Sequence, residues 1–397
     1  MLWLLGCTAP PSAPAPLALS VDRVRDDVDW LASDALGGRV PGTPGHDLAV
    51  DGLAERMAAA GLQPADAYAH RFPLTLDRLR YGLGPDGAVF EVPAEQQGVD
   101  LLGLLPGTDP VAADEVVLLV AHYDHLGVTA EGDVYNGAFD DAVAVCALLE
   151  LARALRDRPL PRTVGFLLTD AEEDGLDGAL AAVAEPVVPL DRVVAAVGID
   201  PIGRPVLPDF GPLFVIGAER SPALAAAVAA VDADTTEVRR LSRTPVVGYG
   251  SDAEAFWDDA GVPSLWLTSG GMSFYHTVDD DPLTIDYRSV DAHLGALAAL
   301  TVALADPAVH PVDLGPQPLS AGDLEEAVRI LDGALASSVL TEAERALGEG
   351  YRATLAEGVR DGDPVGPDAG VAYASLLLYV IQELTPAHPG PIPPPYP

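Results

Sequence analysis

Residues 116–127, VVLLVAHYDHLG, constrain what this chain can fold into more than any other segment. A run of aliphatic residues ends abruptly at His122, Tyr123, Asp124 and His125. An apolar run that ends in polar residues is typical of a strand buried in a parallel sheet. Ligands of open α/β sheets bind at the carboxyl ends of such strands, so His122 would be placed to bind a metal and Asp124 to orient its second ring nitrogen. The same residues also fit a strand followed by an ordinary polar turn. Polar side chains at the ends of the other strands would favour the metal site over this simpler interpretation.

Strand and helix patterns alternate through the middle of the chain. Apolar runs predict strands at 116–121, 163–169, 193–199, 213–216, 235–240 and 264–267. Between and after them, helical patterns cover 140–154, 176–184, 222–231, 253–260 and 290–305. This alternation favours an α/β fold with a doubly wound, mostly parallel mixed sheet and helices on both faces.

The two ends of the chain add to this core. Before it, helices are expected from Ser20 and over 47–60, with short strands at 70–76, 88–92 and 99–105. After it, a linker leads to amphipathic segments at 320–335, after Thr341 with a capping box, and at 371–384. We therefore expect four parts, which are a leader and tether (1–20), a main domain (21–310), a C-terminal helical appendage (318–386) and a Pro-rich tail (387–397).

Composition excludes some partners. Lys and Arg together number 22 against 60 Asp and Glu, which gives a formal charge of −38, and every Lys or Arg position is Arg. Such a surface repels nucleic acid and anionic lipid, so no nucleic-acid partner is expected. The 49% of hydrophobic residues suffices for a large core. The composition does not indicate an oligomeric state.

The N-terminus leaves two interpretations open. Residues 4–7, LLGC, resemble a bacterial lipoprotein cleavage box, in which Cys7 would carry a lipid anchor in the cell envelope and the following TAPPSAPAP would be a flexible tether. The apolar stretch covers only residues 2–5, however, against ~7–15 in a secretory signal, and no basic residue precedes it. A secreted or cytoplasmic protein is the alternative. Cys146 lies in an apolar helical pattern and is expected to be buried.

Further ionisable side chains follow the other strands. They are Glu172 and Glu173 after 163–169, Asp200 after 193–199, Asp140 and Asp141 at a helix start, and His276 after 264–267. Each has an ordinary interpretation, since acids cap helices and adjacent Glu residues are usually solvated. Together they bring two imidazoles and several carboxylates to one edge of a sheet. That set of groups suits a pair of zinc ions with an open position for water.

Five motifs in this order, AHYDHLG, NGAFDDA, AEEDGLDGA, IDPIGR and YHT, resemble those of the dinuclear-zinc aminopeptidase family. That family includes bacterial secreted metallo-aminopeptidases, with glutamate carboxypeptidase and glutaminyl cyclase as relatives. The resemblance covers roughly residues 21–305. It implies a zinc-exopeptidase-like fold, two zinc ions, and peptide substrates from which N-terminal residues are removed.

The resemblance also implies a role for each site residue. Asp140 would bridge the two metals, with His122 and Asp200 completing one site and Glu173 and His276 the other. The remaining roles concern the reaction: Glu172 as general base, Asp124 as the acid that fixes the tautomer of His122, and Tyr275 as a stabiliser of the oxyanion. His125 has no expected role beyond packing behind the ligands.

Two other functions stay open. A glutaminyl cyclase would share the fold but use one zinc, and an inactive binding module would have lost ligands. The presence of all five ligands and the base favours an active hydrolase. Phe139, where the family commonly has Asp or Asn, could reshape the substrate pocket. A carboxypeptidase would need basic residues near the site; the candidates are Arg204, Arg239, Arg240 and Arg243.

Overall fold

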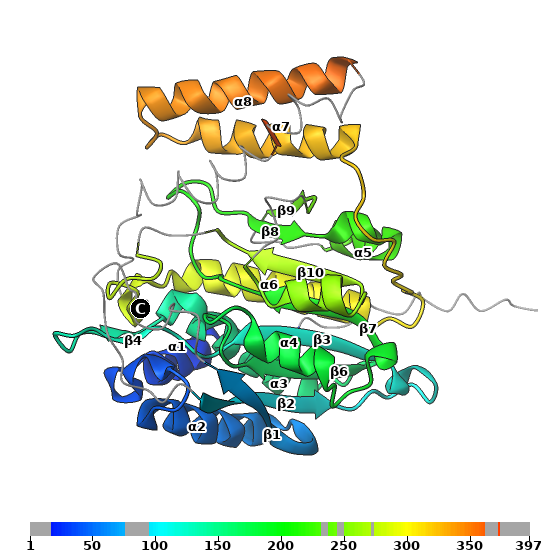
Figure 1. Ribbon diagram of the computed structural model, residues 1–397. Helices are drawn as coiled ribbons and strands as arrows, with labels where there is room; N and C mark the ends of the chain where they lie inside the picture. The colour runs from blue at the N-terminus through cyan, green and yellow to red at the C-terminus, as the bar shows by residue number, and fades with distance from the viewer. Residues whose placement is uncertain are drawn as a thin grey trace, which may run out of the picture.

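The computed structural model describes residues 17–75, 95–231, 237–243, 250–270, 274–361 and 372–373. Its centre is an eight-stranded sheet with the strand order β1-β2-β6-β3-β7-β10-β8-β9 (Figure 1). The strands are β1 (Gln63–Thr75), β2 (Glu95–Leu105), β3 (Val116–His122), β6 (Thr163–Thr169), β7 (Val193–Ile199), β8 (Leu213–Ile216), β9 (Val238–Leu241) and β10 (Ser264–Thr268). A separate small hairpin pairs β4 (Gly127–Val128) with β5 (Val134–Tyr135).

The sheet is mixed, with a parallel centre. Strands β6, β3, β7 and β10 pair in parallel, whereas β1 with β2, β2 with β6, and β10 with β8 are antiparallel. All seven residues of β3 are buried, as expected for a strand covered on both faces. The expected mostly parallel mixed sheet is confirmed.

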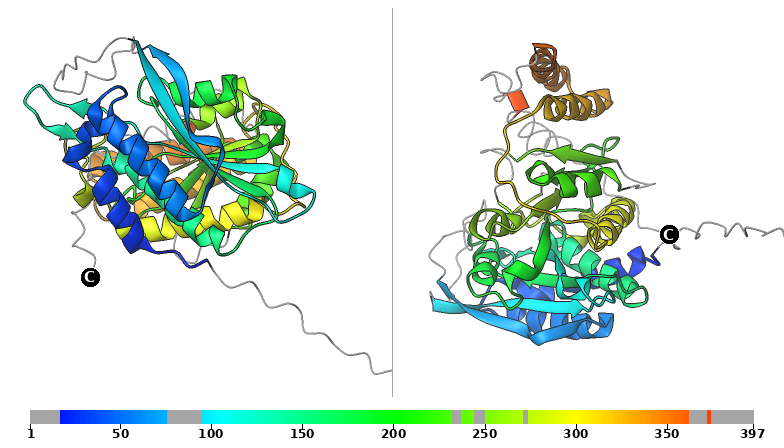
Figure 2. Two further views of the ribbon diagram at one scale, coloured as in Figure 1. Left: turned by 90° about the horizontal axis from the view of Figure 1, so that it is seen from below. Right: turned by 90° about the vertical axis from the view of Figure 1, so that its right-hand side faces the viewer.

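Helices cover both faces of the sheet. One face carries α1 (Val21–Leu31), α2 (Pro44–Ala60), α3 (Val143–Arg156), α5 (Pro222–Ala229) and α6 (Tyr287–Leu304). The other face carries α4 (Asp177–Ala184) and the short helix η6 (Ala255–Asp259). The left view of Figure 2, which looks along the sheet from below, shows these layers.

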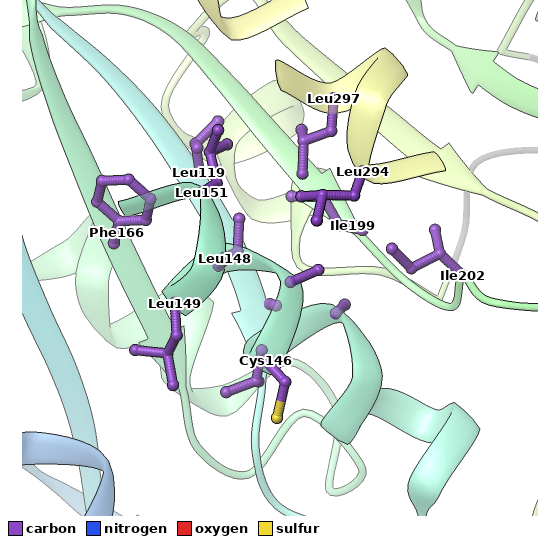
Figure 3. Packing of buried hydrophobic residues seen from close by; sticks show 14 of the residues in the cluster. Leu119, Cys146, Leu148, Leu149, Leu151, Phe166, Ile199, Ile202, Leu294 and Leu297 are labelled. Carbon is purple, nitrogen blue, oxygen red and sulfur yellow. The ribbon is translucent and has the colours of Figure 1, made fainter. Parts of the chain in front are cut away.

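The side chains of β3 pack alternately into two separate hydrophobic clusters. Leu119 belongs to the larger cluster, with Phe166 and residues of α3 and α6, and Figure 3 shows this packing. Leu118 points to the opposite face and belongs to the cluster that includes Phe256. This two-fold alternation is the ordinary geometry of a strand. Cys146 is buried in the larger core, as the sequence predicts.

The C-terminal helices form a further layer beyond the β8 and β9 edge (Figures 1 and 2). Helix α7 (Ala321–Ala336) packs on β9, and α8 (Glu342–Asp361) packs on α7. Ser320 caps α7 with a full capping box, and Thr341 exchanges hydrogen bonds with Glu344 at the start of α8. Apolar side chains of α7, such as Leu324 and Ile330, are buried against this part of the molecule.

Most predicted elements are found, and the differences have local causes. Helix α2 starts at Pro44 because Thr43 accepts a hydrogen bond from the His46 N–H and Pro44 suits the first helical turn. The helix expected from Asp140 begins only at Val143, after an irregular turn over Ala138–Ala142. Strands β1 and β2 are longer than expected.

Some predictions fall on other parts of the chain. The leader with Cys7, the strand at 88–92 and the tail lie outside the described residues, as does the 371–384 helix apart from residues 372–373. Among the described helices, each is too short or too polar to span a lipid bilayer.

Candidate metal and active site

The polar side chains collect at the carboxyl edge of the parallel strands. In the register of β3 and β6, His122 pairs with Thr169, so both strands end at the same level. The turn after β6 carries Glu172 and Glu173, and Asp200 follows β7 directly. The remaining side chains come from the turn before α3, which carries Asp140, and from the segment after β10, which carries His276.

One cluster joins His122, Asp140 and Asp200. The Nε2 atom of His122 lies 3.1 Å from Oδ1 of Asp140 and 3.8 Å from Oδ1 of Asp200. All three residues are buried, and their ligand atoms lie within 4.8 Å of one another. This spacing suits three ligands arranged around one ion.

A second cluster shares Asp140 and adds Glu173. The Nε2 atom of His276 lies 3.0 Å from Oδ2 of Asp140 and 3.2 Å from Oε2 of Glu173. His125 is in the same place, with its Nδ1 atom 2.9 Å from Oε1 of Glu173, and the group of His125, Asp140 and Glu173 also has ligand spacing. The two oxygens of Asp140 therefore face different clusters.

Asp124 lies behind these clusters and contacts both strand ends. Its Oδ1 atom is 3.4 Å from Nδ1 of His122 and accepts a hydrogen bond from the N–H of Glu172 at 3.1 Å. Its Oδ2 atom accepts from the N–H of Glu173 at 3.3 Å. Burial raises the pKa of Glu172 well above its usual range, although the nearby His122 lowers it.

Tyr275 lies at the rim. Its side chain is 40% exposed, and its ring stacks on that of His276 with centroids 3.9 Å apart. Phe139, in contrast, is fully buried and packs edge to face on Phe274. The expected effect of Phe139 on the pocket would therefore act through its neighbours.

The donor set fits a bound metal. Several buried ligand atoms in the clusters face only other ligand atoms and make no hydrogen bond of regular geometry within the described residues; they include His125 Nδ1, Asp140 Oδ2, Glu173 Oε1 and His276 Nε2. Imidazole nitrogens and carboxylate oxygens are the groups that bind zinc at catalytic sites. Burial lowers the pKa of His276, but Glu173 and Asp140 raise it more, to about 11. A dication in this place would balance the buried carboxylates in the same way.

Other acids close to the site are also buried. Burial raises the pKa of Asp252 to about 7 and that of Asp280 to about 8. The Thr169 hydroxyl donates a hydrogen bond to Asp252. Acids that remain without a counterion in a low-dielectric interior favour the protonated form.

Four residues around the site carry contacts that the sequence did not indicate. They are His125, Arg39, Asp280 and His46. His46 contacts Oδ2 of Asp170 at 2.9 Å, just before the Glu172 turn. The sequence held two signals of such contacts. One is the charged Arg39 within the Gly-rich segment GGRVPGTPG, and the other is the carboxylate of Asp280, four residues after His276.

The family comparison agrees with this geometry. The model of peptidase family M28 matches residues 100–301, which is just over half of the chain and contains both clusters. This chain belongs to peptidase family M28. The family is one of peptidases, which hydrolyse peptide bonds.

Related sequences and structures agree with this family. A vacuolar membrane protease from Coprinopsis cinerea is 32% identical over 119 residues, which are 28% of this chain and only 11% of that protein. The fold is similar to a zinc aminopeptidase from Bacillus subtilis, with 15% identity, a TM-score of 0.58, and coverage of 72% of this chain and 96% of that one. A Zn-dependent exopeptidase from Parabacteroides distasonis has 18% identity and a TM-score of 0.54, with coverage of 74% and 100%.

The fold alone does not separate peptidases from cyclases. Glutaminyl cyclase from Porphyromonas gingivalis has 18% identity and a TM-score of 0.54, with coverage of 72% of this chain and 98% of that one. The difference between the reactions must therefore come from the residues of the site.

Proposed function

We propose that this M28 peptidase removes N-terminal residues from peptides with two zinc ions bound at the carboxyl edge of the sheet. The observation that carries the proposal is that two clusters of ligand atoms share the carboxylate of Asp140. In this assignment Asp140 bridges the ions, His122 and Asp200 complete one site, and Glu173 and His276 complete the other. Zinc bound there would supply Lewis acidity, which polarises a carbonyl and lowers the pKa of water.

The acid–base chemistry belongs to Glu172. Its neighbour Glu173 serves as a ligand, while Glu172 takes a proton from the attacking water and gives it to the leaving amine. Asp124 supports both roles, because it holds the backbone of the Glu172 turn and lies against His122. Tyr275 is the proposed hydrogen-bond donor to the oxyanion, and its exposure at the rim, with its ring stacked on that of His276, supports this role.

The basic residues near the site favour a free amino group over a carboxylate as the substrate terminus. A carboxypeptidase must bind a terminal carboxylate through basic side chains, and three of the four candidate arginines already have partners. Two of the candidate arginines have other partners, since Arg239 pairs with Glu237 and Arg243 with Asp258. Arg204 donates to the Thr284 carbonyl.

A zinc assay coupled to a substrate panel tests the proposal. The panel contains aminoacyl and peptidyl amides, their N-blocked forms, C-terminally free dipeptides with a blocked amine, and a peptide with N-terminal Gln. We expect about two zinc ions per chain and cleavage of unblocked substrates only. About one zinc with release of a pyroglutamyl peptide would instead support a cyclase, which the similarity to the Porphyromonas gingivalis cyclase makes the second candidate.

Two features outside the site complete the proposal. Acylation of Cys7 would anchor the enzyme in the cell envelope, with residues 8–16 as a tether. Detergent phase partition of the wild type and of a Cys7→Ser variant tests this, because only the wild type should enter the detergent phase. The proposed helical appendage, 318–386, is supported over its described part by the packing of α7 on β9 and of α8 on α7.

A further inference from the structure

Arg39 is a fully buried arginine whose hydrogen bonds all go to backbone carbonyls. Its Nε atom donates to the carbonyl of Tyr123 at 2.5 Å, and Nη2 donates to that of Gly137 at 3.0 Å. Its Nη1 atom donates to the carbonyls of Asn136 at 2.6 Å and Leu31 at 2.9 Å. A lysine has one donor atom and cannot reach four carbonyls in such a fork.

Three of these four carbonyls, those of Tyr123, Asn136 and Gly137, belong to the segments that carry the proposed ligands. Tyr123 lies between His122 and Asp124, and Gly137 lies three residues before Asp140. A single guanidinium therefore joins the end of β3 to the turn before α3.

Asp280 holds the same turn through the residues that directly precede Asp140 and through Asp140 itself. Its Oδ1 atom accepts a hydrogen bond from the N–H of Phe139 at 2.7 Å, and Oδ2 accepts from that of Asp140 at 3.1 Å. The Ala138 N–H donates to the backbone carbonyl of Asp280 at 3.3 Å. Because Asp280 follows His276 by four residues, this contact ties the His276 segment to the Asp140 turn.

We propose that Arg39 and Asp280 are positioning residues that together set the place of the Asp140 carboxylate, and so the affinity of the site for zinc. Neither residue lies in the ligand clusters, and each acts through the backbone of 136–140. A buried cation without a carboxylate partner is costly, and here the negative charges of Asp124, Asp280 and Asp140 lie near enough to offset part of that cost. The inference rests on the proposed role of Asp140 as a shared ligand.

The test compares Arg39→Lys with Arg162→Lys. Arg162 is the control, because it is equally buried and donates to the carbonyls of Leu304 at 2.8 Å and Asp306 at 2.7 Å, and also to the carboxylate of Glu115 at 2.6 Å. It precedes β6, at the opposite end of the strand from the site. Zinc affinity is measured on the full-length folded proteins by competition with a chromophoric chelator, beside a thermal unfolding curve. Residues that orient ligands typically contribute about 10- to 100-fold to metal affinity, so Arg39→Lys should weaken zinc binding by that factor. Arg162→Lys should lower the melting temperature and leave the affinity unchanged.

Asp280→Asn provides a second variant in case Arg39→Lys does not fold. The amide NH₂ replaces one acceptor that faces a backbone N–H, so this variant should also weaken zinc binding about 10-fold or more. Its control is Asp281→Asn, since Asp281 accepts from the Leu283 N–H and caps a neighbouring turn. Wild-type zinc affinity in a folded Arg39→Lys or Asp280→Asn protein would overturn the inference, as would an equal loss in either control.

Asp140→Ala, measured in parallel, separates the two hypotheses. If Asp140→Ala keeps its zinc, the shared-ligand role fails, and the inference fails with it. If Asp140→Ala loses zinc while Arg39→Lys and Asp280→Asn bind it normally, only the positioning role is wrong.

Discussion

The Oδ1 atom of Asp124 accepts a hydrogen bond from the N–H of Glu172 at 3.1 Å, and the same oxygen lies 3.4 Å from Nδ1 of His122. One carboxylate thus connects the end of β3 with the turn that carries the proposed base and a proposed ligand. Changing Asp124 to Asn places an NH₂ group where one oxygen accepts from the backbone. We expect zinc affinity or kcat/KM to fall by about 10- to 100-fold, as measured by chelator competition and peptide hydrolysis. An unchanged value of both would show that Asp124 only fills space.

Glu172→Gln should remove the proton transfer and leave the metal in place. The amide is nearly the same size but cannot act as a base, so kcat should fall by about 100- to 10,000-fold. Zinc content should stay near that of the wild type. Glu185→Gln, on an exposed residue after α4, is the control and should behave like the wild type. Appreciable activity in Glu172→Gln would mean that another group is the base.

Asp140→Ala and Asp200→Ala should differ in the amount of zinc that they lose. Asp140 contributes to both clusters and Asp200 to one. After dialysis we expect Asp140→Ala to retain almost no zinc, and Asp200→Ala to retain about half of the wild-type content. Elemental analysis of the folded variants gives the result. Equal retention in the two variants would contradict the bridging role.

His293 should make the protein sensitive to acid without involving the site. It lies buried in α6, where Nδ1 accepts from the Gly203 N–H at 3.3 Å, and burial lowers its pKa to about 4. The unfolded chain binds this proton below about pH 6.5, whereas the folded protein does not until about pH 4, so stability falls as the pH decreases between these values.

His293→Asn keeps an acceptor but cannot titrate. Urea unfolding of the metal-free proteins at pH 7 and pH 5 measures the effect. The wild type should lose about 2 kcal/mol more than His293→Asn over this interval. Parallel losses in the two proteins would show that His293 is not responsible.

Leu331→Ala tests how firmly α7 is attached. Leu331 is fully buried in the cluster that joins α7 to the sheet, so its truncation should cost about 2–5 kcal/mol of unfolding free energy. Leu347→Ala, on an exposed part of α8, should have little effect. Chemical denaturation measures both, and we expect kcat of the folded proteins to be unchanged. A neutral Leu331→Ala would mean that α7 contributes little to the stability of the whole.

The sequence was most informative where a strand is buried on both faces. The central strands β6 and β7 were predicted with the observed bounds because an uninterrupted apolar run ends at a polar residue. Strand β1 was predicted too short because its first residues, 63–67, are exposed and include the charged Asp66, so they show no apolar pattern. The two-residue strands β4 and β5 are too short to produce a pattern.

The site was predictable because its proposed ligands directly follow predicted strands in the sequence. The family resemblance indicated the role of each residue, and the shared carboxyl edge of the sheet explains why His122 and Asp200 lie close together. The contacts of Arg39 and Asp280 were not predictable, because they end on backbone atoms of residues about 100 or more positions away. Sequence spacing alone does not tell which of His125 and His276 is the metal ligand. In the structure the side chains of both lie within 3.2 Å of the Glu173 carboxylate.

The order of strands determines when the site is assembled during folding. The proposed ligands extend from His122 to His276, and the parallel strands that carry them pair only with partners far along the chain. Contacts between such distant segments form slowly, because the chain loses the entropy of closing a long loop before the contacts themselves stabilise it. A partly folded chain therefore has no assembled site until β10 has paired with β7. Zinc bound at the finished site would stabilise only the folded protein.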